Sequence, residues 1–129
     1  MATNIVRIDT SPSHQDAYTV SHPASPVSGD PVLIGTAMTG IALTDEGEGQ
    51  NIATQTSCHT GSFVARFSVA GQGPAGAAAI PQYGRVYYDQ AATPVLNADN
   101  TNGVFFGFAL QAVGSGATAT IEVLHVEPS

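Results

Sequence analysis

The 129-residue chain contains no lysine and no tryptophan, and its three arginines stand against ten acids. A Walker A phosphate loop is excluded, because that loop requires a lysine. The formal net charge of −7 also argues against direct binding of DNA or RNA, since proteins bind phosphates by neutralising them with Lys and Arg. The scarcity of positive charge favours a soluble protein that does not bind nucleic acid, or a protein that binds a basic surface of another protein.

Cysteine and long apolar runs are equally scarce. Cys58 is the one cysteine, so an internal disulfide is impossible, which fits a reducing compartment. No apolar run approaches the roughly 20 residues of a membrane span, and the first residues lack the basic start and apolar stretch of a signal peptide. We therefore expect synthesis in the cytoplasm and no membrane partner.

Bulky side chains are also few. Hydrophobic residues make up 43% of the chain, but many of them are alanines, and aromatic residues reach 7%. A domain of this size buries about 65% of its unfolded surface, and alanine adds little area to that burial. The composition predicts a thin core, for which oligomerisation would be a further source of burial.

Short strands separated by regular turns are what the chain does contain. From Gly29 onward, turn signals rich in Gly, Asn and Asp recur roughly every ten residues. The run Ser62–Ser68 alternates, with Phe63, Ala65 and Phe67 on one face, and residues 117–126 alternate in the same way. No stretch has the period of an amphipathic helix. The pattern predicts an all-β fold, either a small β-barrel or a β-sandwich of short antiparallel strands.

The N-terminal part of the chain has a different composition. Two short strand-like pieces lie among Ser, Pro, His and Asp, and two X-Pro pairs within residues 22–26 favour extended or turn geometry. We expect residues 1–27 to form an extended N-terminal arm, and residues 28–129 to form the β-domain.

Motifs with catalytic or ligand-binding potential are weak. Residues 71–76 formally match G-x-G-x-x-G, but a dinucleotide site needs a helix after the glycines, and Pro81 follows too soon. Cys58 and His59 are adjacent, whereas zinc sites need spaced pairs. The acids of residues 45–48 lie in a glycine-rich turn, where solvation is the ordinary outcome. The sequence therefore predicts no enzyme, no cofactor and no metal site.

Three phenylalanines fall within four residues, at Phe105, Phe106 and Phe108. One face of a thin core has little room for all three. Burial of each contributes about 1.5–3 kcal/mol, so leaving one exposed would be costly. Two interpretations stay open at this point, a fully buried central strand and a subunit interface.

Five segments in order resemble a known family: Ser28–Gly35, Gly40–Asp45, Gly84–Asp89, Gly107–Leu110 and Thr118–Leu124. They are similar to the small tailed-phage capsid decoration, or cement, proteins, which act like the lambda-type head decoration proteins. The resemblance covers residues 28–124. It implies a β-tulip-like domain that binds the outer surface of the icosahedral head as a homotrimer and stabilises the shell against DNA pressure. The implied partner is the major capsid protein, and the implied location is the virion.

The arm is the predicted capsid contact. Its alternating strand could add to an exposed sheet edge of the major capsid protein, with Arg7 paired to a shell carboxylate. The residues predicted to contact the capsid are Asn4, Ile5, Val6, Arg7 and Ile8, and those predicted to form the trimer interface are Phe105, Phe106 and Phe108.

Two other functions are compatible with parts of the sequence. A virion-surface carbohydrate- or host-binding β-module could use Tyr83, Tyr87 and Tyr88 to stack on sugar rings, although strand tyrosines more often pack in a core or interface. An enzyme ranks last, because no residue grouping supplies a nucleophile, a base and an orienting partner together.

Overall fold

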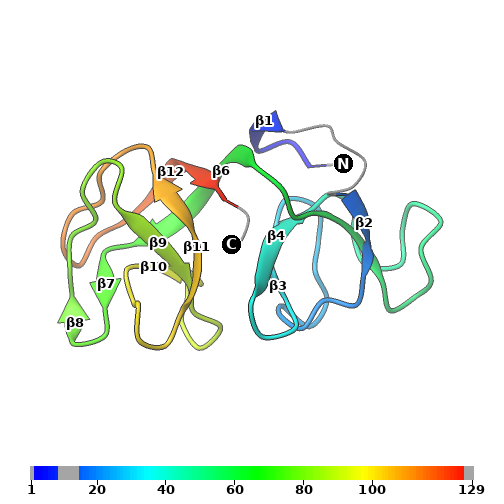
Figure 1. Cartoon of the computed structure of the whole chain (residues 1–129), viewed down its shortest axis with the longest axis horizontal. Helices are drawn as coiled ribbons and strands as arrows, with labels where there is room; N and C mark the ends of the chain where they lie inside the picture. The colour runs from blue at the N-terminus through cyan, green and yellow to red at the C-terminus, as the bar shows by residue number, and fades with distance from the viewer. Residues whose placement is uncertain (1, 9–14, 127–129) are drawn as a thin grey trace.

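The computed structural model describes residues 2–8 and 15–126, and every regular element in these ranges is a β-strand (Figure 1). No helix long and apolar enough to cross a membrane occurs within them. The all-β prediction is confirmed. The strands are β1 (Ile5–Ile8), β2 (Gln15–Tyr18), β3 (Pro31–Ile34), β4 (Met38–Ala42), β5 (Thr56–His59), β6 (Phe63–Ala70), β7 (Gln72–Gly73), β8 (Gly76–Ala77), β9 (Arg85–Tyr88), β10 (Leu96–Asn97), β11 (Val104–Ala109) and β12 (Thr118–His125).

Five strands close into a small barrel in the order β6-β10-β9-β11-β12, and pairing of β12 with β6 completes the ring. That closing pair is antiparallel and runs from Thr118 opposite Ala70 to His125 opposite Phe63. The single parallel pairing of the barrel joins β10 to β6, with Leu96 opposite Val69. Closure leaves these strands few free edges.

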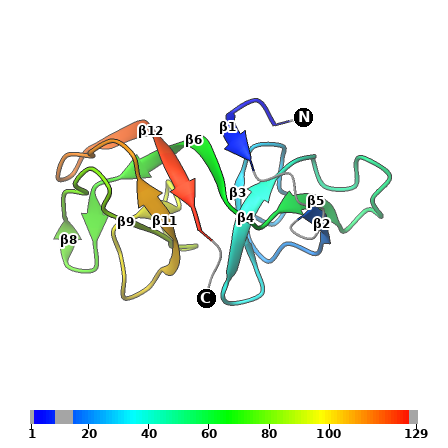
Figure 2. The ribbon, with the colours of Figure 1, turned by 45° about the horizontal axis from the view of Figure 1, so that its top comes forward.

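A second, four-stranded sheet lies beside the barrel, in the order β2-β5-β4-β3 (Figures 1 and 2). The outer edge of β3 is covered by residues 21 and 22, because Leu33 and His22 exchange backbone hydrogen bonds of 2.8 and 3.2 Å. At the far end of the barrel, β7 and β8 form a two-stranded hairpin. This hairpin contains the G-x-G-x-x-G match of residues 71–76, so the glycines lead to no helix and form no dinucleotide site.

The core follows the alternation seen in the sequence. Phe63, Ala65 and Phe67 of β6 point into the barrel, whereas Arg66 on the opposite face is exposed. A separate small cluster holds Val20, Val32, Ala42 and Cys58 on the second sheet. The barrel cluster, which is the larger, contains Leu33, Ile41, Phe63, Ala65, Phe67, Val69, Ile80, Val86, Tyr88, Leu96, Phe106, Ala109, Val113, Ile121 and Val123.

Side-chain hydrogen bonds join the barrel to the second sheet at two places. On β9, the Tyr88 hydroxyl donates to the His22 carbonyl at 3.1 Å and lies 2.7 Å from His22 Nδ1. On β12, His125 Nε2 lies 2.9 Å from the hydroxyl of Thr39, a residue of β4. The barrel and the second sheet are therefore held together by these polar contacts and by the packing of Leu33 and Ile41 in the barrel cluster.

Candidate interaction surfaces

Strand β1 is the end strand of the six-stranded sheet and pairs antiparallel with β6. Ile5 and Ile8 pack against the barrel core, while Arg7 is exposed. The Asn4 side-chain amide donates to the carbonyls of Gly29 and Arg66, both at 3.1 Å, which fixes the start of the strand. Of the residues predicted to contact a capsid, Arg7 is thus the one whose side chain is exposed, and β1 offers its outer backbone edge.

The two described parts of the predicted arm lie in different sheets. β1 belongs to the barrel side and β2 to the second sheet, where Gln15 to Tyr18 pair with β5. Each strand lies at an end of its sheet, so each has one edge without a strand partner among the described residues. Such edges are natural places for another chain to add a strand.

A β-bulge on β11 separates the three phenylalanines. The register steps from Phe105 opposite Tyr87 to Gly107 opposite Val86, which leaves Phe106 as the extra residue. Phe106 is fully buried in the barrel, whereas Phe105 and Phe108 lie half-buried with ring centroids 5.5 Å apart. Phe106 is therefore a core residue of the barrel, and Phe105 and Phe108 share its outer surface.

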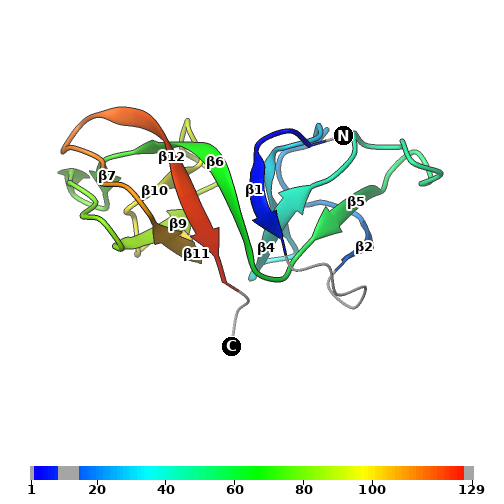
Figure 3. The same ribbon diagram turned by 90° about the horizontal axis from the view of Figure 1, so that it is seen from above.

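The strand registers align five residues into one outward row that crosses five strands. Arg85 lies opposite Phe108, Phe108 opposite Leu124, Leu124 opposite Val64, and Val64 opposite Arg7. Directly opposed residues of antiparallel strands point to the same side of the sheet. Figure 3 looks onto the strands β11, β12, β6 and β1 that carry most of this row. We name it the arginine-ended row, since it has an apolar centre and an arginine at each end.

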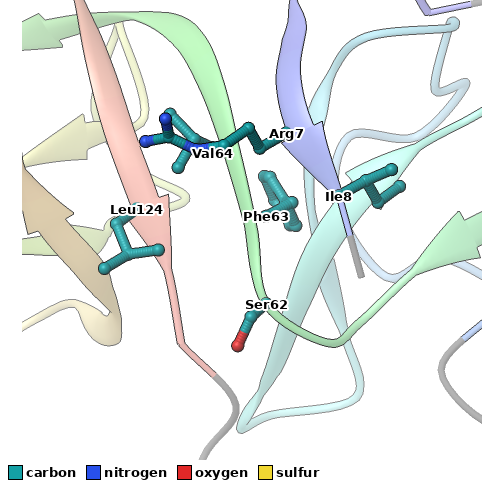
Figure 4. Close-up of a pocket in the computed structure, with 6 residues that line it drawn as sticks. All are labelled: Arg7, Ile8, Ser62, Phe63, Val64 and Leu124. Atoms are coloured by element: carbon teal, nitrogen blue, oxygen red, sulfur yellow. The ribbon is translucent and has the colours of Figure 1, made fainter. Parts of the chain in front are cut away.

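One end of the row is hollowed. A pocket of ≈ 200 Å³ lies between β1, β6 and β12 and is lined by Arg7, Ile8, Ser62, Phe63, Val64 and Leu124. In Figure 4 the Arg7 side chain reaches from β1 across Val64, and Leu124 stands on the far side. The arginine stem thus covers apolar surface while the charged head stays at the rim.

The positive charge of the chain is concentrated on this face. The third arginine, Arg66, stands two residues from Val64 and pairs with Glu122 at 3.2 Å. Both partners are solvent-exposed enough for the pair to contribute little to stability. Arg85 places its guanidinium carbon 5.8 Å from the centroid of the Phe105 ring. All three arginines therefore lie on the outer side of the six-stranded sheet, which wraps round the barrel and also carries Glu122.

The sequence did not predict that Arg85, Leu124 and Tyr87 belong to this surface, and it offered Tyr87 only as a possible sugar-stacking ring. Tyr87 stacks edge-to-face on Phe105 at 6.0 Å, which extends the aromatic pair into a patch. Alternation within each strand gives the outward side of that strand. Alignment of the outward residues across strands depends on register, which is set by the bulge and the long pairing of β6 with β12.

The tyrosines do not form a common platform. Tyr88 is 1% exposed and belongs to the barrel core, so it cannot stack on a sugar. Tyr83 is 66% exposed and Tyr87 is half-buried against Phe105. The carbohydrate-binding alternative therefore loses one of the three rings that could have served it.

Reactive side chains are buried and dispersed. Burial raises the pKa of the Cys58 thiol to about 12, which disfavours the reactive thiolate. His59 hydrogen-bonds the Ser62 carbonyl at 3.2 Å. Within residues 2–8 and 15–126, no three His, Cys, Asp or Glu side chains gather as a metal site would require. In the turn of residues 97–103, which is rich in Asn and Asp, Asp99 accepts hydrogen bonds from Thr101 and Asn102 and so stabilises the turn.

His125 is a buried titratable group at the joint between barrel and second sheet. A carbonyl oxygen can only accept, so Nδ1 carries the proton that bonds Gly61 O at 2.7 Å, and Nε2 accepts from the Thr39 hydroxyl. The ring stacks on Phe63 with centroids 4.7 Å apart. Burial, with a smaller effect of His59, lowers the pKa of His125 from 6.5 to about 4.

We expect acid to destabilise the protein through this group. Between pH 6.5 and 4 the unfolded chain binds a proton that folded His125 does not, so stability falls as the pH falls. The loss from this side chain should reach about 3 kcal/mol at pH 4 and below. Urea unfolding at a series of pH values would measure it. His125→Gln should flatten the curve between pH 6.5 and 4, and an unchanged slope in that variant would refute the assignment.

Taken together, a closed barrel, an open strand edge and an apolar face ended by arginines define a small all-β protein equipped to bind other proteins. The chain belongs to the phage cement protein family, whose model matches residues 11–125. No curated protein and no solved structure shows a significant match. Family membership implies a structural protein that associates with the phage capsid and is located in the virion.

Proposed function

We propose that the protein binds the outer surface of the icosahedral head as a homotrimer and stabilises the shell against the pressure of packaged DNA. The observation that carries the proposal is the match to phage cement proteins over nearly the whole chain. The open edge of β1 supports it, because a preformed strand edge suits a protein that must attach to another sheet.

The shell contact is assigned to residues 4–8 of the arm. Asn4 anchors the strand through two hydrogen bonds, and Ile5 and Ile8 are packed on the core, so β1 is ordered before binding. Preorganisation lowers the entropy lost on association. The outer edge of β1 then pairs with a strand of the major capsid protein, and exposed Arg7 pairs with a shell carboxylate. The strand edge supplies affinity, and Arg7 supplies orientation.

The trimer interface is assigned to the outer part of β11, with Phe105 and Phe108 as its direct contacts. Both rings are half-buried in one copy, and association would remove the remaining surface from water. Three arms in one trimer also multiply a weak shell contact into tight attachment. Such a trimer could link neighbouring capsomers and resist their separation. Its synthesis is assigned to the host cytoplasm, in keeping with a single, buried and unpaired cysteine.

Co-sedimentation with capsids stripped of the protein tests the proposal. We expect saturable binding at about one trimer per local three-fold position, the stoichiometry that avidity from three contacts would favour. If the protein bound neither expanded nor unexpanded shells, the proposed capsid function would be refuted. Filled heads should also retain DNA to a higher temperature when the protein is bound than after it is stripped.

Variants of β1 test the assigned contact. Deleting residues 2–8 should abolish shell binding, but it also removes Ile5 and Ile8 from the core, so the fold of that variant needs a separate check. Arg7→Glu avoids this difficulty, because Arg7 is exposed. We expect it to weaken shell binding roughly tenfold or more, as loss of a close charge pair does, while the lost packing of the Arg7 stem lowers the melting temperature only slightly. Full binding by both variants would show that the shell contact lies elsewhere.

A further inference from the structure

The loop between β4 and β5 carries a combination of side chains that complements the arginine-ended row. In the part of the chain that the structure describes, three large hydrophobic side chains are strongly exposed, and Ile52 in this loop is one of them at 64%. Exposed Glu48 and half-buried Glu46 lie a few residues before it. The loop projects at the right in Figure 1, at the opposite end of the molecule from the barrel. We name residues 46–55 the acidic knob.

Backbone hydrogen bonds hold the acidic knob in shape. The Gly47 amide donates to the Gln55 carbonyl at 2.8 Å, which closes the loop at its base. The Gln55 amide in turn donates to Ile52 O at 3.0 Å, and the Asn51 side chain donates to Ser57 Oγ at 3.0 Å. A loop with so many internal bonds presents Ile52 in a defined position, which makes it suitable for insertion into a partner.

We propose that the acidic knob of one copy docks on the barrel face of the next copy, and that this contact builds the trimer. Ile52 packs against Phe108 and Leu124, and the carboxylates of Glu46 and Glu48 pair with Arg85. The inference rests on the proposed trimer and names the partner surface for Phe105 and Phe108. Arg7, at the other end of the row, stays available for the shell.

The distribution of charge over the molecule favours a second copy of the chain as the partner that docks on the barrel. Five of the ten acids lie on the second sheet and its loops, at Asp16, Asp30, Asp45, Glu46 and Glu48, whereas the barrel carries Arg66 and Arg85 together with Asp89, Asp99 and Glu122. Because Arg66 is paired with Glu122, Arg85 beside Phe105 is the barrel cation that attracts the acidic knob of another copy. Because face and knob are different surfaces, the contact is head-to-tail, and three copies can close it into a ring.

Charge exchange tests the contact, with native mass in the absence of capsids as the measurement. We expect the wild-type chain to be a trimer that dissociates as salt is raised. Arg85→Glu and Glu48→Arg should each raise the concentration for half-assembly roughly tenfold or more. The double variant should recover assembly, since it restores an attractive pair. Asp16→Arg changes charge as Glu48→Arg does, but on β2, and should leave the mass unchanged.

Mixing the single variants gives a second test of the contact. Arg85→Glu keeps an intact knob and Glu48→Arg keeps an intact face, and the two altered surfaces also carry opposite charges, so the mixture should assemble at concentrations at which neither variant assembles alone. The proposal is overturned if the wild type is monomeric at its highest soluble concentration, or if both single variants remain trimers. Co-sedimentation with shells is measured independently of native mass. Shell binding by variants that remain trimers would show that the capsid function holds and that the trimer interface lies elsewhere.

Discussion

Replacing Gly107 by alanine should destabilise the barrel by on the order of 3 kcal/mol, as overpacking of a rigid site does. A β-carbon at this position would lie 2.0 Å from the Leu124 carbonyl oxygen and 3.0 Å from the Cα of His125. Both atoms belong to the backbone of β12, which is paired along its whole length with β6 and cannot retreat easily. Urea unfolding of Gly107→Ala beside the wild type would measure the loss.

Gly114→Ala is the matched control for this substitution. Its β-carbon would meet nothing closer than the Cβ of Ala117 at 3.7 Å, an ordinary van der Waals contact. Removing the flexibility of a glycine where alanine fits lowers the entropy of the unfolded chain, so this variant should be neutral or slightly stabilised. Equal losses at Gly107 and Gly114 would contradict the close-approach argument.

The same close approach explains a repeat in the sequence. Gly40-Ile41-Ala42-Leu43 and Gly107-Phe108-Ala109-Leu110 share the pattern G-x-A-L. A β-carbon on Gly40 would lie 2.4 Å from the His59 carbonyl oxygen of β5, just as one on Gly107 would strike β12. Gly40 allows the backbone of β5 to pass close by in the second sheet, and Gly107 does the same for β12 in the barrel. The repeated pattern therefore reflects close backbone packing at both places.

Alternation was a sound guide wherever a strand keeps its pleat. The faces expected for Phe63, Ala65 and Phe67, and for Ile121 and Val123, are those observed, because both β6 and β12 pair without interruption. The sequence could not decide between a barrel and a sandwich, and it did not predict that five strands close into a barrel with a second sheet beside it. Pairings such as β6 with β12 join residues far apart in the chain, and period-two patterns carry no information about partners.

The candidate site was harder to predict for the same reason. Strict alternation puts Phe106 and Phe108 on one face and Phe105 on the other, whereas the bulge brings Phe105 and Phe108 together. Nothing in the segment marks a bulge except Gly107, whose meaning depends on the approach of β12. Similarly, Arg7 and Arg85 are 78 residues apart in the chain, and only the register across five strands puts them in one row.

Phe106→Ala should cost about 3–5 kcal/mol of the free energy of unfolding, the usual loss when a buried phenylalanine is truncated. Phe106 is 0% exposed and meets Phe63, Phe67 and His125 edge-to-face, with centroid distances of 6.2, 5.6 and 4.8 Å. Truncation would leave a cavity among rings held by a closed barrel, which can collapse only partly.

Phe105→Ala removes the same atoms from the outer surface and is the matched comparison. Its effect on an isolated copy should be small, about 1 kcal/mol, because the ring touches Tyr87, Phe108 and Arg85 at the surface. Its main effect should fall on association, which makes apparent stability depend on protein concentration. Unfolding measured at two concentrations separates the cases. Phe106→Ala should lower stability equally at both concentrations, whereas Phe105→Ala should reduce the concentration dependence itself. If both variants lost the same stability and showed the same concentration dependence, the bulge would not separate a core phenylalanine from an interface phenylalanine.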